Sequence, residues 1–352
     1  MGVSDSGEVG LVPSAAGHTL TNMFDVIGDV HGHVDELVEL LHRMDYRRDG
    51  GAFRHADRVA VFLGDWIDRG PHIRHTLQVV REMVQAGSAK AVLGNHETNA
   101  MAYATPRSPS HAPVNAQDWC RPHTDRNFNI HAETLRQIPA PELGTWLDWF
   151  RDIPWWLDLG DLRCVHACWD EAAMQTLIRA FGPRWKSTPE VIRAVHFRGS
   201  PEADAFEDIL KGREIDLPEG VTLPDPEGHR RKAIRTRWYE PADGRTYADF
   251  SLPPRDGLPS QPLPPEFVKS WTHYPLDAPP VIVGHYWLPA TAEPRPLAPN
   301  VACVDYSVAR GGLLAAYRWQ GEQSLQADRF VYVRARSSAA EERPASVDSM
   351  GA

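Results

Sequence analysis

The chain has 352 residues, a hydrophobic fraction of 42%, a charged fraction of 24% and a formal net charge of −10. This length and composition are typical of a globular protein with a large core, built as one α/β domain or two smaller ones. The acidic balance disfavours a general nucleic-acid or anionic-membrane binder, because such proteins need a basic surface. No run approaches the roughly 20 apolar residues of a membrane span.

The two ends of the chain are predicted to be disordered tails. Residues 1–21 are small and polar and contain no basic segment followed by an apolar stretch, so we expect no secretory signal. Residues 335–352 contain almost no large apolar side chains. We therefore expect a cytoplasmic protein, and nothing in the sequence indicates a membrane or a partner protein. Four cysteines in no disulfide or zinc-ribbon spacing are expected to be reduced: Cys120, Cys164, Cys168 and Cys303.

Residues 22–334 are predicted to form one domain with two insertions. The hydrophobic pattern of residues 23–94 predicts strand, helix, strand, helix, strand, with the helices over 34–44 and 73–84. The first insertion, 98–150, is predicted to be mostly helical. The second, 171–279, is rich in Pro and Gly and is predicted to be mainly loops over the site, with one helix over 203–210. The remaining strands are expected at 155–159, 162–166, 280–284, 301–306, 313–319 and 329–333.

Four short segments place polar side chains directly after apolar runs. They are GDVHGH at Gly28–His33, GDWIDRG at Gly64–Gly70, GNHE at Gly94–Glu97 and GHYW at Gly284–Trp287, and the runs before them are FDVI, VAVFL, AVL and VIV. An apolar run followed by glycine is typical of a buried strand that ends in a tight turn. The side chains of all four segments are thus expected at strand ends, where α/β folds tend to build their sites.

The residue types in these segments, with a further histidine at the end of another predicted strand, indicate a metal site. Mixed oxygen and nitrogen ligands without thiolate suit Mn²⁺, Fe or Zn²⁺ better than Cu(I) or an iron–sulfur cluster. Six ligands exceed what one tetrahedral ion with an open position needs, so two ions that share one carboxylate are the economical interpretation. The candidate ligands are Asp29, His31, Asp65, Asn95, His166 and His285, with Asp65 as the shared carboxylate.

The motifs GDVHG, GDWIDRG and GNHE, followed by VHA at Val165–Ala167 and GH at Gly284–His285, resemble the calcineurin-like metallophosphoesterases. The likeness is greatest to the phosphoprotein phosphatase branch, in a bacterial-type member, and covers about residues 24–100, 160–170 and 280–306. It implies an α/β (α+β) fold, a four-layer sandwich of two mixed β-sheets flanked by helices. It also implies a phosphatase that attacks a phosphate monoester directly with a metal-bridging hydroxide.

The resemblance also implies how the ligands divide between two divalent cations, with Mn²⁺ expected and Fe or Zn²⁺ as alternatives. Asp29, His31 and Asp65 would hold the first ion. Many relatives have a second histidine two positions after the one in the GH motif, and this chain has Trp287 there. The first ion is therefore expected to keep more water. The second ion would be held by Asp65, Asn95, His166 and His285.

Three further residues of the motifs are expected to carry the reaction. Arg69 would bind the phosphoryl oxygens through its forked guanidinium, together with Asn95. His96, next to Asn95, would act as general acid for the leaving group, a role worth about 10²–10⁴-fold. Asp68 would orient the His96 imidazole and favour its protonated form.

A second phosphate-binding arginine is expected between His166 and His285. Arg237 is the candidate in the strand-like AIRTRWY, with Arg235 beside it and Arg198 as a further alternative. Asp305, just past a predicted strand, is a candidate hydrogen-bond partner for a ligating histidine.

Several functions remain open from the sequence. The leading one is a phosphomonoesterase, with a serine/threonine protein phosphatase as one form of it, and the alternative in the same class is a dinucleoside polyphosphate hydrolase of the Ap4A type. A non-catalytic phosphate-binding scaffold predicts loss of the acid or the phosphate-binding residues, but Asp68, Arg69 and His96 are all present. A nuclease would need a basic groove, which the net charge does not favour. Each substrate class considered is phosphorylated: a protein, a nucleotide or a small molecule.

Overall fold

The computed structural model describes residues 23–224, 230–291 and 293–336. The predicted N-terminal tail lies outside these residues, as does the predicted C-terminal tail from residue 337 onward. Ala335 and Arg336 are described, and their backbone N–H groups donate to the carbonyl of Gly312 and the carboxylate of Glu36. No helix within the described ranges is both long and apolar enough to cross a membrane.

The larger of the two main sheets joins the two ends of the chain. In it β1 lies between β4, which runs parallel to it, and β15, which runs antiparallel, while β5 extends the parallel side and β14 and β16 pair with β15. It is therefore a mixed sheet. Its strands are β1 (Met23–Ile27), β4 (Arg58–Phe62), β5 (Ala89–Ala91), β14 (Asp305–Tyr306), β15 (Leu313–Trp319) and β16 (Phe330–Arg334).

The second main sheet comes from the middle and the C-terminal part of the chain. Its central pairs, β12 with β7 and β12 with β13, are parallel, and β6 pairs antiparallel with β7, so this sheet is mixed as well. Side chains of both sheets belong to one hydrophobic core, which confirms the predicted fold of two mixed sheets with helices. Its strands are β6 (Trp156–Asp158), β7 (Arg163–Val165), β12 (Val281–Val283) and β13 (Val301–Cys303).

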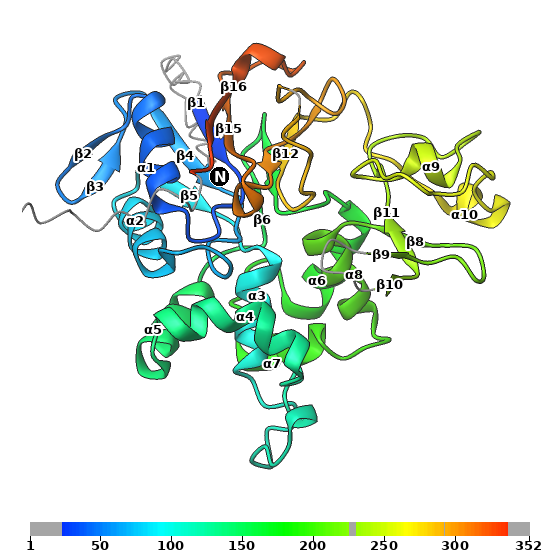
Figure 1. Cartoon of the computed structure of the whole chain (residues 1–352), viewed down its shortest axis with the longest axis horizontal. Helices are drawn as coiled ribbons and strands as arrows, with labels where there is room; N and C mark the ends of the chain where they lie inside the picture. Colours follow the sequence, from blue (N-terminus) through cyan, green and yellow to red (C-terminus); the bar gives the residue numbers. More distant parts are fainter. Residues whose placement is uncertain (1–22, 225–229, 292, 337–352) are drawn as a thin grey trace, which may run out of the picture.

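Helices α1 (Val34–Arg43) and α2 (Ile73–Gln85) cover the first sheet (Figure 1). In α1 the buried side chains include Val34, Leu37 and Leu41, the spacing of one helical face. The two helices contact each other and strands of this sheet or of the small hairpin β2 (Arg47–Asp49) and β3 (Ala52–Arg54). Both helices begin where they were predicted and end within one residue of the predicted ends.

The first insertion is helical, as predicted. It places α3 directly after the GNHE motif, so that the residues of this motif start a helix. Figure 1 shows α3, α4, α5 and α7 gathered on one side of the molecule, away from β16. The elements of the insertion are α3 (Asn95–Tyr103), η1 (Ala116–Asp118), α4 (Asp125–Gln137) and α5 (Ala140–Phe150).

The second insertion contains more helix than its composition predicted. Several of its prolines stand in the first turn of a helix, where a missing N–H costs nothing, so they start helices instead of breaking them. Its later part packs around a small core of its own that includes Ile215, Ile234 and Phe250. Its elements are α6 (Glu171–Phe181), α7 (Pro189–Val195), α8 (Pro201–Lys211), β8 (Glu214–Asp216), β9 (Leu223–Pro224), β10 (Arg230–Arg231), β11 (Ala233–Arg235), α9 (Tyr247–Phe250) and α10 (Pro265–Ser270). The short helices η2 (Val308–Arg310) and η3 (Ala327–Arg329) flank β15.

A buried ion pair ties the first sheet together at β1. Asp25 is fully buried, and its Oδ1 accepts hydrogen bonds from Arg58 Nε at 2.8 Å and Arg318 Nε at 3.1 Å. Arg58 also donates to the carbonyls of Phe24 and Trp319. The guanidinium of Arg58 thus links β4 to both β1 and β15.

We predict that Asp25→Asn lowers the free energy of unfolding by about 3–5 kcal/mol, because it leaves the buried Arg58 without a compensating charge. Urea unfolding followed by circular dichroism measures this loss. Asp35→Asn is the matched control: Asp35 pairs with Arg336 at 3.3 Å, but half of its side chain is exposed, so the expected cost is below about 1 kcal/mol. Equal costs for the two variants would refute this role for the buried pair.

Candidate active site

The motif residues occupy strained turns at the strand ends. His31, Asp65, Asp68, Arg69 and His285 all have positive φ, between 43° and 72°, a region that side chains rarely adopt. Such residues tend to gather at functional sites, where the surrounding structure supports the strain. Here the support comes from close packing of the turns.

Two glycines allow the turns to meet. A Cβ on Gly94 would lie 2.1 Å from Asp65 Oδ1, and a Cβ on Gly284 would lie 2.2 Å from Asp29 Oδ1. Glycine is thus required at both positions for steric reasons. The GNHE and GHYW motifs begin with glycine because a carboxylate from another strand end occupies the space of a side chain.

The predicted ligands come together around Asp65. One carboxylate oxygen of Asp65, Oδ2, lies 3.7 Å from His31 Nε2, and the other, Oδ1, lies 3.5 Å from His166 Nε2. His166 Nε2 is also 3.1 Å from Asn95 Oδ1 and 3.2 Å from His285 Nδ1. Asp29 completes the set by accepting the backbone N–H of His285. All six of these side chains are buried.

These side chains fit divalent cations. Among the described residues, ligand atoms of two groups that share Asp65 lie within 4.8 Å of one another, one with His31 and His96 and the other with His166 and His285. His31 Nε2 and His285 Nε2 are buried and have no hydrogen-bond partner in this part of the chain. Buried imidazole nitrogens without hydrogen-bond partners, in side chains gathered around a carboxylate, are expected of a metal-binding site.

Backbone carbonyls orient two of the imidazoles. His31 Nδ1 donates to the carbonyl of Ile67 at 2.7 Å, and His166 Nδ1 donates to that of Leu63 at 2.6 Å. Each bond places the proton on Nδ1 and leaves Nε2 as the electron-pair donor. Leu63 and Ile67 flank Asp65, so the turn that supplies the shared carboxylate also orients its neighbours.

The buried carboxylates of Asp29 and Asp65 favour the binding of cations at the site. Burial and the nearby Asp305 raise the pKa of Asp29 well above its usual range. Burial also acts on Asp65 to raise its pKa, but imidazoles, chiefly those of His166 and His96, hold it well below the usual range. For His166, burial opposes protonation, yet the Asp65 and Asp29 carboxylates raise its pKa to about 10. In the protein without cations, a proton on His166 partly balances these carboxylates.

Glu97, the last residue of GNHE, holds the Asp65 turn. Its carboxylate accepts hydrogen bonds from the backbone N–H groups of Asp65, Trp66 and Gly94 at 2.7–3.0 Å. Glu97 is fully buried, and burial together with the charge of Asp65 raises its pKa to about 7. No role was predicted for Glu97 from the sequence, although its place in the GNHE motif indicated that it belongs to the site.

The candidate general acid has a second support that the sequence did not reveal. Asp68 Oδ2 lies 2.5 Å from His96 Nδ1, as predicted for an orienting carboxylate. Its other oxygen, Oδ1, accepts hydrogen bonds from His131 Nδ1 at 2.7 Å and Thr134 Oγ1 at 2.5 Å. Burial acts to raise the pKa of Asp68, but the hydrogen bonds from His131 and His96 lower it below its usual range. Helix α4 therefore fixes the carboxylate that orients His96.

A cavity of about 600 Å³ opens over the ligand cluster, and Asp65, Asn95, His96 and His285 form part of its wall. Most of the charged residues on this wall are basic, in contrast to the acidic chain as a whole. They come from the DRG motif, both insertions and the loop before β15. The basic residues are Arg69, Arg121, Arg126, Lys211, Arg231, Arg235, Arg255 and Arg310, and the acidic ones are Asp65 and Asp256.

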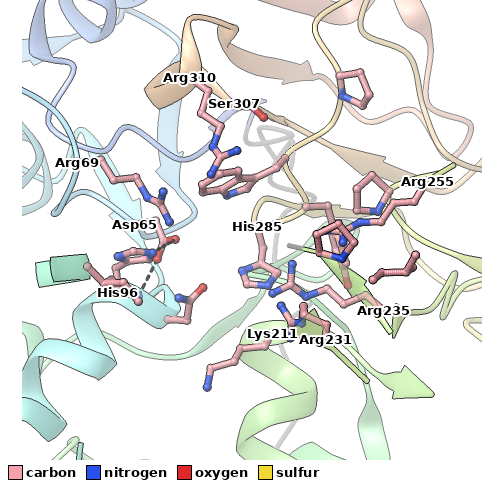
Figure 2. Close-up of a pocket in the computed structure, with 18 of the residues that line it drawn as sticks. Asp65, Arg69, His96, Lys211, Arg231, Arg235, Arg255, His285, Ser307 and Arg310 are labelled. Atoms are coloured by element: carbon pink, nitrogen blue, oxygen red, sulfur yellow. Dashed lines mark hydrogen bonds and ion pairs between the residues drawn. The ribbon is translucent and has the colours of Figure 1, made fainter. Parts of the chain in front are cut away.

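Trp287 holds two of the arginines. The guanidinium carbons of Arg69 and Arg310 each lie 4.1 Å from the centre of its ring (Figure 2). Cation–π contacts of this kind are attractive and orient the guanidinium. Asp305 Oδ2 in turn accepts the backbone N–H of Trp287 at 2.7 Å. Asp305 therefore supports the Trp287 turn. The sequence had suggested instead a hydrogen bond between Asp305 and a ligating histidine.

The arginines proposed for the second phosphate contact lie in different places. Arg235 reaches the cavity wall, but Arg237 is not among the residues that line it. Arg237 instead pairs with Glu240 at 3.1 Å and donates to the carbonyl of Ser251. Arg198 is exposed and is not part of the wall. Of the two candidates, Arg235 therefore lies where it can reach a ligand in the cavity, and no local pattern in the sequence distinguished it from Arg237.

We predict that metal binding releases protons, because a cation on His166 must displace the proton that this residue holds up to a pKa of about 10. The apparent affinity for Mn²⁺ should therefore rise as the pH rises from 6 toward 9. Calorimetric titration in two buffers with different ionisation enthalpies measures the protons released. His166→Gln should release fewer protons, and no release by the wild-type protein would contradict the prediction.

The sequence of this chain matches a known protein family. The family model for calcineurin-like phosphoesterases matches residues 23–217, more than half of the chain. A 74-residue segment is 46% identical to the asymmetrical bis(5'-nucleosyl)-tetraphosphatase PrpE of Halalkalibacterium halodurans, and it covers 21% of this chain and 30% of that protein's length.

A longer match extends over most of the chain. The symmetrical bis(5'-nucleosyl)-tetraphosphatase of Vibrio cholerae is 26% identical over 309 residues, which cover 84% of this chain and 94% of that protein. A solved structure of a protein serine/threonine phosphatase from Saccharomyces cerevisiae has a TM-score of 0.44 and 12% sequence identity, over 93% of this chain and 82% of that chain. The motifs, the site and the family match lead to one conclusion: the chain belongs to the calcineurin-like phosphoesterase family.

Proposed function

We propose that this protein is a metal-dependent phosphoesterase that holds two divalent cations and hydrolyses phosphate monoesters by direct attack on phosphorus. One observation carries the proposal: buried, unpartnered imidazole nitrogens surround the Asp65 carboxylate at the base of a basic cavity. Asp29, His31 and Asp65 would hold one cation, and Asp65, Asn95, His166 and His285 the other. Two cations bound there would supply a hydroxide nucleophile at neutral pH and neutralise phosphoryl charge.

The chain's own residues have distinct tasks in this scheme. Arg69, positioned by Trp287, binds the phosphoryl oxygens in a bidentate manner, and the Asn95 amide is available beside them. His96 faces the cavity and donates a proton from Nε2 to the departing oxygen, while Asp68 holds its Nδ1. His131 and Thr134 keep Asp68 in that orientation. The role of Arg237 in phosphate binding passes to Arg235.

A second candidate function is hydrolysis of dinucleoside polyphosphates. It is favoured by the similarity to a symmetrical bis(5'-nucleosyl)-tetraphosphatase over most of the chain and by the many basic residues of the cavity. A panel of p-nitrophenyl phosphate, a phosphoserine peptide and diadenosine tetraphosphate, each assayed with Mn²⁺-loaded protein, separates the two functions. No hydrolysis of any of these compounds would contradict a phosphoesterase function.

We predict that a chelator abolishes hydrolysis and that Mn²⁺ restores it. Asp65→Asn should lower kcat by at least about 100-fold, because the shared position needs two anionic oxygens; residues that only support ligands typically cost 10–100-fold. Metal content, measured by atomic absorption, should fall together with activity. Full turnover by the metal-free protein or by Asp65→Asn would exclude the mechanism.

We also predict that the role of His96 depends on the leaving group. His96→Asn should lower kcat by about 10²–10⁴-fold for phosphoserine, whose alkoxide is strongly basic, and much less for p-nitrophenyl phosphate. Arg69→Ala should impair both substrates alike, because it contacts the phosphoryl group that they share. Steady-state kinetics on both substrates, with metal content verified, separates the two roles.

Variants of His131 test whether helix α4 acts through Asp68. His131→Ala should reproduce part of the His96 pattern, with phosphoserine affected more than p-nitrophenyl phosphate. His131→Asn retains an N–H donor near the position of Nδ1 and should recover much of the loss. If both variants lose the two activities equally, His131 has only a structural role.

A further inference from the structure

The cavity has basic residues on two sides of the metal ligands. Arg69 and Arg310 contact Trp287 on one side, near Asp65 and His96. Figure 2 shows Arg231, Arg235 and Arg255 on the other side of His285. In the proposed function, the phosphate that is hydrolysed binds to Arg69 on the first side and to Arg235. It gives no task to the remaining basic residues.

These residues come from the second insertion and form one electrostatic group. Arg235 is on β11 and Arg231 on β10, while Lys211 ends α8 and Arg255 follows α9. Burial lowers the pKa of Arg235, and the neighbouring charges of Arg231 and Arg255 lower it further. Arg235 lines the same cavity as His285, so the group lies on the wall that also holds the metal ligands.

Two glutamates pair with three members of this group. Glu214 Oε1 accepts a hydrogen bond from Arg231 at 2.8 Å and lies 3.9 Å from Arg235 Nε. One carboxylate oxygen is therefore shared between two guanidinium groups. Lys211 pairs with Glu207 at 2.5 Å. Neither glutamate is among the residues that line the cavity, whereas Lys211, Arg231 and Arg235 are, and Asp256 is the acidic side chain that lines it beside Arg255. Crowded like charges at a cavity wall favour the binding of an anion.

We propose that Lys211, Arg231 and Arg255 form a second phosphate-binding subsite beside Arg235, so that the preferred substrate carries at least one phosphate beyond the one that is hydrolysed. This proposal rests on the proposed function. A substrate with a single phosphate would leave one basic side of the cavity without an anion, whereas a polyphosphate chain would extend from Arg69 past the metal ligands to Arg235. The wall also contains the apolar residues Leu223, Pro253 and Pro254.

Inhibition of p-nitrophenyl phosphate hydrolysis by inorganic tripolyphosphate and by orthophosphate tests the proposal, at a buffered concentration of free Mn²⁺. Tripolyphosphate should bind at least about tenfold tighter than orthophosphate, because added charge-assisted hydrogen bonds are strong. Arg231→Gln and Lys211→Gln should each reduce this ratio severalfold and change the KM for p-nitrophenyl phosphate less.

Arg230→Gln is the matched control. Arg230 is next to Arg231 on β10, but it is exposed, donates to Thr222 and does not line the cavity. This variant should keep the wild-type ratio. A tri-glutamate peptide serves as a second control for charge, and it should not inhibit at concentrations at which tripolyphosphate does.

The outcomes separate this proposal from the proposed function. If p-nitrophenyl phosphate is hydrolysed but the two inorganic anions bind equally, the second subsite is refuted and the phosphoesterase stands. An unchanged ratio in both Arg231→Gln and Lys211→Gln, or equal inhibition by tri-glutamate, refutes it as well. If the Mn²⁺-loaded protein hydrolyses no phosphate ester, the proposed function fails, and calorimetric titration with the same two anions still tests the subsite.

Discussion

The site depends on a single buried carboxylate, Asp65, and on the groups that make its ionised form tolerable. A carboxylate with almost no exposure to solvent is expensive unless it is paired and hydrogen-bonded. The imidazoles of His31, His96 and His166 all lie within 4 Å of it, and the backbone N–H of His96 donates to its Oδ1 at 2.9 Å. Since each imidazole comes from a different segment, the position of Asp65 determines where the strand ends must meet.

This convergence has a conformational cost that the motifs share. Three of the four motif turns contain non-glycine residues with positive φ. Each turn also contains a glycine whose Cβ would collide with a carboxylate or the backbone. The cost is offset by packing between the two sheets and by buried acceptors such as Glu97, which binds three backbone N–H groups around Asp65. Each strained turn of the site is therefore held from behind by the fold and not by its ligands alone.

Much of the scaffold was predictable because it obeys local rules. The strand-ending motifs, helices α1 and α2 and the strand β15 follow from hydrophobic periodicity and from glycine at turns. The six ligand candidates were also recognisable, because five stand in such a motif and His166 ends another predicted strand. Residues that act across the chain were not: His131 lies 63 positions from Asp68, and nothing around it marks a contact with the motif.

The basic residues of the cavity wall were also difficult to predict from the sequence. Arg235 and Arg237 alternate along one short segment, so the sequence offers both equally, and the choice depends on which one the sheet directs at Glu240 and which at the cavity. Net charge was also a poor guide to local charge. The whole chain has a net charge of −10, yet the insertions bring arginines to a concave, partly apolar wall. In such a cavity a weakly screened positive field attracts anionic ligands, whatever the total charge of the protein. In the function that we propose, the family core supplies the reaction centre, and the insertions determine which anions reach it.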